Sequence, residues 1–162
     1  SCAQINTLKD DLGSKYDELS ESSDETAQTD QSEAPAAMAK GTRPIFVSVG
    51  SNGTIITSSN GTKWTKNASG TNVKLRAVTY GNGTFVAVGF SGTILTSSDG
   101  KKWTKRKSGT KKHLRGTAYG DGQFVMVGNA GTVLTSSDST TWEKSKSGTS
   151  RHLRRVFFTL LK

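Results

Sequence analysis

The sequence predicts an all-β fold built from repeated four-stranded sheets, and three observations support this prediction. Apolar residues make up 31% of the chain and glycine contributes 18 residues, which favours short strands joined by tight turns. Residues of the same kind recur every 39 positions, as at Phe46, Phe85 and Phe124. Each 39-residue unit also contains four short strand-like runs separated by turn residues.

The 39-residue repeat extends over residues 46–162, which is three whole units. A period between 20 and 50 residues is typical of solenoids, propellers and other arrays, so the contents of the unit must distinguish them. Several further positions keep their residue type in all three units: the tryptophans Trp64, Trp103 and Trp142, the glycines Gly53, Gly92 and Gly131, the leucines Leu75, Leu114 and Leu153, and the aromatics Tyr80, Tyr119 and Phe158.

The four strands expected within one unit are Leu75–Tyr80, Phe85–Gly89, Thr93–Ser98 and Lys102–Lys107. The turns between them contain Gly, Asn, Ser and Asp, residues that tolerate the positive φ of tight hairpins. The second and third strands are apolar on both faces, which indicates a sheet packed between two neighbouring sheets. Four-stranded blades stacked around an axis form a β-propeller, and this is the fold we expect, with three blades per chain.

The segment Ser97–Trp103 resembles the Asp-box repeat of sialidase-like, sortilin-like and photosystem-assembly-factor propellers. In those propellers the repeat forms the hairpin between the third and fourth strands of a blade. The pattern departs from the family in that glycine directly follows the aspartate, and the other units carry Asn60 and Ser139 at altered positions. We expect Asp99 and Asp138 to accept backbone N–H bonds within their own turns, and the tryptophans to cover the hairpins.

Three blades are too few to close a propeller, which typically has four to eight. The first unit begins with a second strand at Phe46, and the last unit ends with a first strand at Leu153–Phe158. We therefore expect the last strand of one chain to complete the first blade of another, giving a six-bladed head-to-tail homodimer, with a nine-bladed trimer as the next alternative. A truncated relative of a longer propeller is the other interpretation, because residues 159–162 depart from the repeat.

Residues before the repeat divide into two regions with different expected roles. Residues 1–19 are interpreted as a lipid-anchor-like N-terminus that could form a short amphipathic helix, with Cys2 as the candidate lipidation site of a bacterial lipoprotein. Residues 20–43 are acidic and too polar to bury a core, which predicts a flexible linker before the module of residues 44–162. This organisation predicts a location at the bacterial cell envelope, periplasmic or surface-exposed, with a lipid anchor as the membrane attachment.

Charge separates along the chain, with a net −6 over residues 1–40 and +15 over residues 41–162. Such a basic module attracts polyanions or acidic surfaces. An alternative role for lysines on an outermost strand is to block edge-to-edge aggregation. The candidate ligand-binding residues are those basic residues and histidines that recur between units: Lys66, Lys105 and Lys144 on the fourth strand, Arg76, Arg115 and Arg154 on the first, and His113 and His152 just before it.

The repeat contains no enzyme signature, whether paired carboxylates, a phosphate-binding loop, or a Cys/His cluster. We therefore expect no catalytic residue, metal or cofactor, and the main hypothesis is a binding or adhesion module that recognises a glycan or another polyanion. The alternative is a structural or assembly protein that binds another envelope protein. A sialidase-like glycosidase has little support, because residues 41–162 contain four acids in all. Nucleic acid is not the expected partner, since the aromatic residues are better explained as core.

Overall fold

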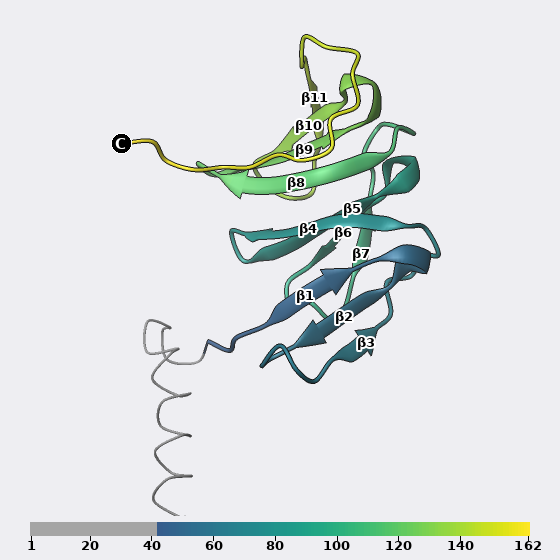
Figure 1. The fold of residues 1–162 in the computed structure, drawn as a ribbon, viewed down its shortest axis with the longest axis vertical. Coiled ribbons are helices and arrows are strands. Elements are labelled where there is room, and N and C mark those ends of the chain that lie inside the picture. Colours follow the sequence, from purple (N-terminus) through teal and green to yellow (C-terminus); the bar gives the residue numbers. More distant parts are fainter. Residues whose placement is uncertain (1–41) are drawn as a thin grey trace, which may run out of the picture. The chain divides into compact units, whose positions relative to one another are not determined.

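The computed structural model describes residues 42–162, which fold into three antiparallel sheets stacked face to face (Figure 1). Residues Ile45–Lys162 form a compact unit. The expectations for Cys2, for a helix within residues 1–19 and for nearly all of the linker lie outside the described residues. Within residues 42–162, no helix is long and apolar enough to cross a membrane.

Each sheet is an antiparallel meander that corresponds to one repeat unit, as predicted. A short 3₁₀ turn joins the second strand of each blade to the third. Among the described residues, blades 2 and 3 have four strands each, and blade 1 has three, corresponding to the second, third and fourth strands of the other blades. Blade 1 comprises β1 (Phe46–Val49), η1 (Ser51–Gly53), β2 (Ile55–Ser58) and β3 (Thr65–Asn67); blade 2 comprises β4 (Leu75–Gly81), β5 (Thr84–Gly89), η2 (Phe90–Gly92), β6 (Ile94–Ser97) and β7 (Thr104–Arg106); blade 3 comprises β8 (Leu114–Gly120), β9 (Gln123–Gly128), η3 (Asn129–Gly131), β10 (Val133–Ser136) and β11 (Glu143–Ser145).

The recurring glycine of the 3₁₀ turns is required by a close backbone approach. Gly92 has a φ of +68°, and a Cβ at this position would lie 1.9 Å from the carbonyl oxygen of Thr110. Only glycine combines this left-handed conformation with so near a neighbour. The same contact recurs at Gly53 and Gly131, at 1.8 Å in both cases, which explains why the sequence repeats a glycine here.

Two hydrophobic layers hold the three blades together, one on each face of blade 2. Val86, Val88 and Ile94 pack with Phe124, Met126 and Leu134 of blade 3. On the other face of the same sheet, Ala87 and Leu95 pack with Ile55 and Val47 of blade 1. Successive side chains of a strand point to opposite faces. This alternation explains why β5 and β6 carry apolar residues on both faces, as the sequence predicted for sheets packed on both sides.

The hairpins between the third and fourth strands share one hydrogen-bonded turn, here called the Ser-Asx turn, at residues 58–64, 97–103 and 136–142. In blade 2 the Asp99 carboxylate accepts the backbone N–H groups of Lys101 and Lys102 at 2.8 and 2.9 Å. The indole N–H of Trp103 donates to the Gly100 carbonyl at 2.9 Å. These turns occupy residues that were expected to be strand, so β6 and β7 are shorter than predicted.

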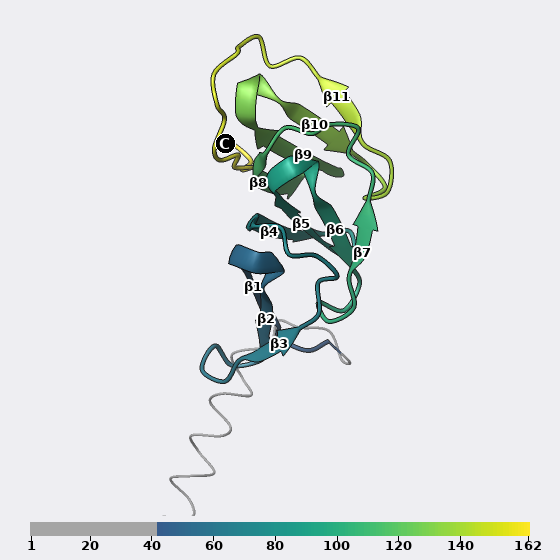
Figure 2. The ribbon, with the colours of Figure 1, turned by 90° about the vertical axis from the view of Figure 1, so that its right-hand side faces the viewer.

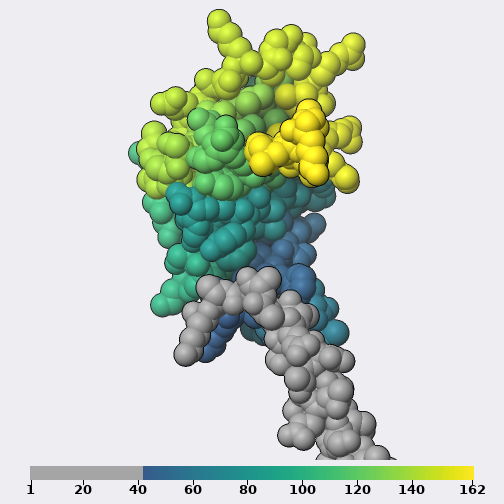
Figure 3. Space-filling view, turned by 90° about the vertical axis from the view of Figure 1, so that its left-hand side faces the viewer, coloured from purple at the N-terminus to yellow at the C-terminus, as the bar shows by residue number. Residues whose placement is uncertain are grey.

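The predicted first strand at Leu153–Phe158 does not form a strand, which corrects the sequence-based expectation. The segment runs beside β8 along the face of blade 3 (Figures 1 and 3). Leu153 donates its backbone N–H to the Gly128 carbonyl at 2.9 Å. The segment has the position of a first strand, but within residues 42–162 no neighbouring strand pairs with it.

Candidate functional site

The strands of each blade end at two opposite faces of the module, and charge differs between them. One face carries the 3₁₀ turns η1–η3 and the loops 68–74, 107–113 and 146–152, and is here called the η face. The other, the Ser-Asx face, carries the Ser-Asx turns and the hairpins between first and second strands. All four carboxylate side chains of residues 42–162 belong to the Ser-Asx face: Asp99, Asp121, Asp138 and Glu143.

The η face is basic because its turns and loops contain lysines and arginines but no acid. Asp99 and Asp138 accept backbone N–H groups of their own turns on the opposite face. Positive charge is therefore concentrated and uncompensated at this end of the blades. We count nine cations at the η face: six lie in its loops, namely Lys74, Lys107, Lys111, Lys112, Lys146 and Arg151, and three lie directly after these loops, namely Arg76, Arg115 and Arg154.

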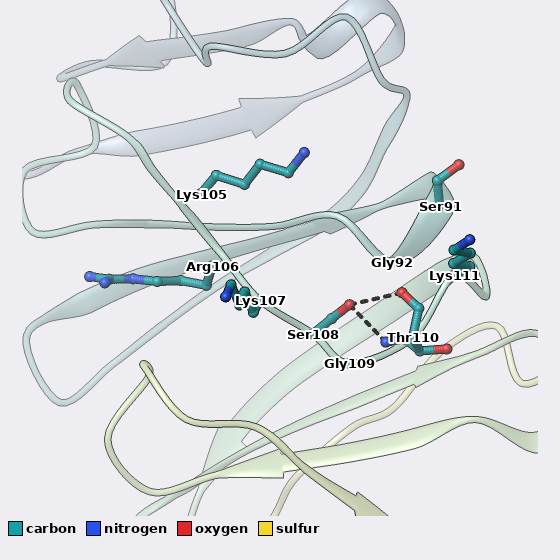
Figure 4. Close-up of a pocket in the computed structure, with 9 residues that line it drawn as sticks. All are labelled: Ser91, Gly92, Lys105, Arg106, Lys107, Ser108, Gly109, Thr110 and Lys111. Carbon is teal, nitrogen blue, oxygen red and sulfur yellow. Dashed lines mark hydrogen bonds between the residues drawn. The ribbon is translucent and has the colours of Figure 1, made fainter.

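Blade 2 has a shallow hollow of about 630 Å³ where its outermost strand reaches the η face (Figure 4). The end of β7 supplies Lys105, Arg106 and Lys107 to its wall, and the following loop supplies Lys111. Ser108 shapes this loop, because its hydroxyl accepts the Thr110 N–H at 3.3 Å and donates to the Thr110 carbonyl at 3.0 Å. The remaining lining residues are Ser91, Gly92 and Gly109.

An aromatic ring carries two cations near the boundary between blades 2 and 3. The Phe90 ring has the Lys74 ammonium and the Arg115 guanidinium each 5.8 Å from its centroid, within the range of cation–π attraction. His113 stacks on the same ring with a centroid distance of 4.1 Å. Arg115 also donates from Nε to the Asn129 side-chain oxygen. This arrangement holds Arg115 in place, whereas Arg76 is exposed.

The two histidines predicted as ligand-binding residues each tie a 3₁₀ turn to the loop that leaves the same blade. His113 accepts the backbone N–H of Ser91 at Nδ1, at 2.9 Å, and His152 accepts that of Ala130 at 3.0 Å. Both donors have a φ of 54°. Each bond joins the 3₁₀ turn to the segment that follows the outer strand of its own blade, β7 or β11. One ring nitrogen of each histidine is thus already used structurally.

The repeated lysines and arginines occupy equivalent places in successive blades, as expected. Lys66, Lys105 and Lys144 are exposed and lie opposite Ile56, Leu95 and Leu134 in the strand ladders. Arg76 and Arg115 each sit where the register of the first strand slips by one residue, a β-bulge. Bulges redirect a side chain out of the regular alternation. Arg154 occupies the corresponding position in the segment after blade 3 and is exposed.

The sequence analysis missed the Phe90 cluster because Phe90 and Lys74, unlike Arg115 and His113, are not repeated. Phe90 occupies a position where the other units have Ser51 and Asn129, and Lys74 occupies a position where they have histidine. A search for positions that keep their residue type between units does not find such residues. The sequence feature that could have revealed them is a large aromatic residue in a turn that is polar in the other units, close to basic residues.

Within residues 42–162, no group of three or more His, Cys, Asp and Glu side chains is placed to hold a metal ion. The Asp99 and Asp138 carboxylates accept hydrogen bonds within their own turns. Backbone N–H bonds from Thr141 and then Thr140 lower the pKa of Asp138 to about 2. The corresponding bonds from Lys102 and Lys101 lower the pKa of Asp99.

Stacked antiparallel blades with the 39-residue repeat define a protein of the β-propeller class. The chain belongs to the DUF6242 beta propeller domain family, whose model matches residues 17–153. A solved structure described as YCF48 bound to D1 peptide is similar, with a TM-score of 0.55 and 21% sequence identity. The match covers 64% of this chain and 36% of that one, so the chain spans about a third of that relative. No curated protein matches the sequence. The propeller fold expected from the sequence is confirmed.

Proposed function

We propose that this chain is a non-enzymatic binding module of the assembly-factor kind, whose η face holds an acidic segment of a partner protein. The observation that carries the proposal is the separation of charge between the two faces, with nine cations and no carboxylate on the η face. The similar solved structure contains a propeller bound to a peptide, which favours a protein ligand. With a lipid anchor at Cys2, the partner would be a protein of the bacterial cell envelope.

The chemistry of the η face suits a flexible chain of carboxylates better than a single compact anion. Exposed ion pairs contribute about 0.2–1 kcal/mol each, so useful affinity requires several at once. Lys105, Lys107 and Lys111 surround one hollow and can contact successive carboxylates of an extended segment. Attraction of this kind is screened by salt, because the Debye length is about 10 Å at 0.1 M.

A sulfated or phosphorylated glycan is the second candidate ligand. The observation that favours it is the exposed lysine repeated on the outer strand of every blade, at Lys66, Lys105 and Lys144. A polymer with regularly spaced anions could contact these lysines in turn, and multivalency would raise a weak affinity. A glycosidase is disfavoured, because such enzymes use a pair of carboxylates at the bond they cleave, and the η face has none.

Charge reversal on the two faces tests the proposed function. The full chain is titrated with a labelled oligoglutamate peptide, and the triple variant Lys105→Glu, Lys107→Glu, Lys111→Glu is compared with the control Lys63→Glu, Lys101→Glu, Lys102→Glu on the Ser-Asx face. Both variants change the net charge equally. We expect the first to weaken binding by about tenfold or more, which is the combined contribution of three exposed pairs, and the control by less than about twofold.

Two outcomes would contradict the proposal. Equal weakening by both variants would mean that total charge, not the η face, attracts the peptide. Absence of peptide binding by the unmodified chain at about 0.05 M salt, where screening is weak, would exclude an acidic protein segment as the ligand. Tight binding of a sulfated oligosaccharide under the same conditions would then support the glycan.

A further inference from the structure

We infer that the turn Asn82–Gly83, at the tip of the hairpin formed by β4 and β5, is a site of spontaneous chemical modification in which the asparagine amide is converted to a carboxylate. Strands β4 and β5 lie side by side in blade 2, and this turn joins them (Figures 1 and 2). The modification does not depend on the ligand proposed above, because the turn belongs to the Ser-Asx face and not to the η face.

The reaction requires that the backbone nitrogen after the asparagine reach the side-chain amide. The Gly83 nitrogen gives its proton to hydroxide and attacks Cγ of Asn82, so that a C–N bond forms and the amide nitrogen leaves as ammonia. Water then opens the resulting cyclic imide at either carbonyl. Opening at Cγ gives aspartate, whereas opening at the backbone carbonyl gives isoaspartate, in which the main chain runs through the side chain. Glycine favours the attack because it has no Cβ to crowd its nitrogen.

The chain contains three Asn-Gly sequences, at Asn52, Asn60 and Asn82. All three asparagines are exposed, so exposure does not distinguish them. The hydrogen bonding of the following glycine does, because its N–H must leave any acceptor before the nitrogen can attack. The structure therefore ranks the three sites by the hydrogen bonds that a local opening has to break.

The Asn52 site is protected by the close backbone approach at the 3₁₀ turn. The Gly53 N–H donates to the Val73 carbonyl at 2.9 Å, and Gly53 is buried. The position of a Gly53 Cβ lies 1.8 Å from the Thr71 carbonyl oxygen, so this part of the backbone has little room to rotate. The nitrogen can attack only after the turn separates from the loop that precedes β4.

The Asn60 site is protected by the Ser-Asx turn of blade 1. The Gly61 N–H donates to the Ser58 hydroxyl oxygen at 2.8 Å. The Asn60 side-chain oxygen accepts the N–H groups of Thr62 and Lys63, both at 3.0 Å. Both reacting groups, the glycine nitrogen and the asparagine amide, are therefore held by hydrogen bonds.

The Asn82 site has neither kind of protection. The ladder pairs Gly81 with Thr84, so Asn82 and Gly83 form a two-residue loop outside it. Their φ values are 45° and 72°, positive at both positions as in a type I′ hairpin turn. Among residues 42–162, neither the Gly83 N–H nor the Asn82 side chain forms a hydrogen bond, and a Cβ on Gly83 would meet no atom within 4 Å. The turn can therefore rotate into the reactive geometry without losing a bond of either group.

Blade 3 shows that this hairpin accommodates the aspartate product. The equivalent loop is Asp121–Gly122, enclosed by the paired residues Gly120 and Gln123. The φ values of this loop are 47° and 75°, close to those of the loop in blade 2. Aspartate formed from Asn82 should therefore keep the turn and add a carboxylate to the Ser-Asx face, which increases the difference in charge between the two faces.

The isoaspartate product has a further consequence, because it adds a carbon to the main chain of the loop. A two-residue loop of type I′ matches the twist of its two strands, and a longer loop loses this match. The pair nearest the loop, Gly81 and Thr84, is affected first. The next pair is Tyr80 and Phe85, whose rings lie 4.5 Å apart. One product thus changes charge alone, and the other changes the hairpin as well.

Peptide mapping of the full chain by mass spectrometry tests this assignment. The chain is kept at mildly alkaline pH and sampled over time, and fragment spectra measure, at each asparagine, the mass gained when oxygen replaces the amide nitrogen. We expect Asn82 to convert at least about twofold faster than Asn52 or Asn60, since one hydrogen bond changes an opening equilibrium by about two- to tenfold. Chromatography should separate two products, including isoaspartate, because direct hydrolysis of the amide yields aspartate alone.

Ser58→Ala supplies a matched control, because it removes the hydroxyl that accepts the Gly61 N–H. Asn60 should convert about twofold or more faster in this variant, and the rate at Asn82 should not change. The free peptide Gly-Asn-Gly-Thr of residues 81–84 gives the rate of the unfolded sequence. Conversion of Asn52 or Asn60 as fast as that of Asn82 would overturn the assignment. So would an unchanged Asn60 rate in Ser58→Ala, aspartate without isoaspartate, or an intact Asn82 when the peptide is fully converted.

Discussion

Blade 1 and blade 2 share one sequence pattern but bury it to different degrees. The third-strand residues Ile55 and Ile94 are both fully buried, because neighbouring sheets cover them in each case. The second-strand residues Phe46 and Phe85 differ, at 53% and 8% exposed. The difference shows that the outer three strands of a blade form a sheet without the first strand. The first strand is needed to close the aromatic core at the Ser-Asx end.

Truncating the equivalent phenylalanines should give the largest effect and tests this comparison directly. Phe124→Ala removes a fully buried ring and should lower the free energy of unfolding by about 3–5 kcal/mol. Phe46→Ala should cost less than about 1 kcal/mol in the monomer, because an exposed ring gains little from burial. Urea unfolding at low protein concentration measures both. Equal losses would mean that blade 1 is closed within one chain.

The next largest loss of stability is expected when a methyl group is added beneath an aromatic ring that packs on the preceding blade. Gly81→Ala places a Cβ 2.0 Å from the Tyr119 ring, which is fixed by β8, and should destabilise the fold by about 1–3 kcal/mol. Gly120→Ala meets Phe158 at the same distance. Because no strand within residues 42–162 pairs with the Phe158 segment, the segment can move away, and unfolding experiments should show a smaller loss of stability. A larger loss for Gly120→Ala would contradict this.

The sequence predicts a part of the structure well when the residues that contact each other there belong to the same repeat unit or to equivalent positions of neighbouring units. The blade strands, the Ser-Asx turn bonds and the two-sided packing of β5 followed from the 39-residue period, because each unit supplies its own partners. The segment Leu153–Phe158 is not a strand within residues 42–162, since a strand requires a paired neighbour and none of these residues pairs with it. The Phe90 ring joins Lys74, Arg115 and His113, and the 39-residue period does not reveal this contact because Phe90 and Lys74 occur in one unit alone.

The Ser-Asx turn of blade 3 differs from those of blades 1 and 2, because it has a serine where they have a glycine. Ser139 has a φ of 60°, where the other turns have Gly61 and Gly100, and the buried Trp142 indole N–H has no hydrogen-bond partner within residues 42–162. A non-glycine residue in this conformation costs about 1–2 kcal/mol. Ser139→Gly should therefore raise the stability by about 1 kcal/mol in thermal unfolding. A decrease would show that the Ser139 hydroxyl, which donates to the Asp138 carbonyl, stabilises the turn more than the strain destabilises it.

The smallest predicted effect concerns the Ser-Asx turns at acid pH. The folded-state pKa of Asp138, about 2, lies below its ordinary value of 3.8. The stabilisation from this carboxylate is therefore present above pH 3.8 and lost as the pH falls towards 2. The Asp99 pKa is lowered in the same direction.

Blade 1 supplies the matched control for this effect, because Asn60 accepts the N–H groups of Thr62 and Lys63 at 3.0 Å without carrying a charge. The double variant Asp99→Asn, Asp138→Asn should keep the fold and flatten the pH dependence of unfolding between pH 3.8 and 2. An unchanged pH profile would show that other groups cause the acid sensitivity.

Hydrogen–deuterium exchange of β1 and β5 tests most directly whether the first strand is what closes a blade. The account predicts that the β5 amides, which lie between two paired strands, exchange slowly, while the β1 amides that face away from β2 exchange much faster. Protection of β1 equal to that of β5 would contradict it.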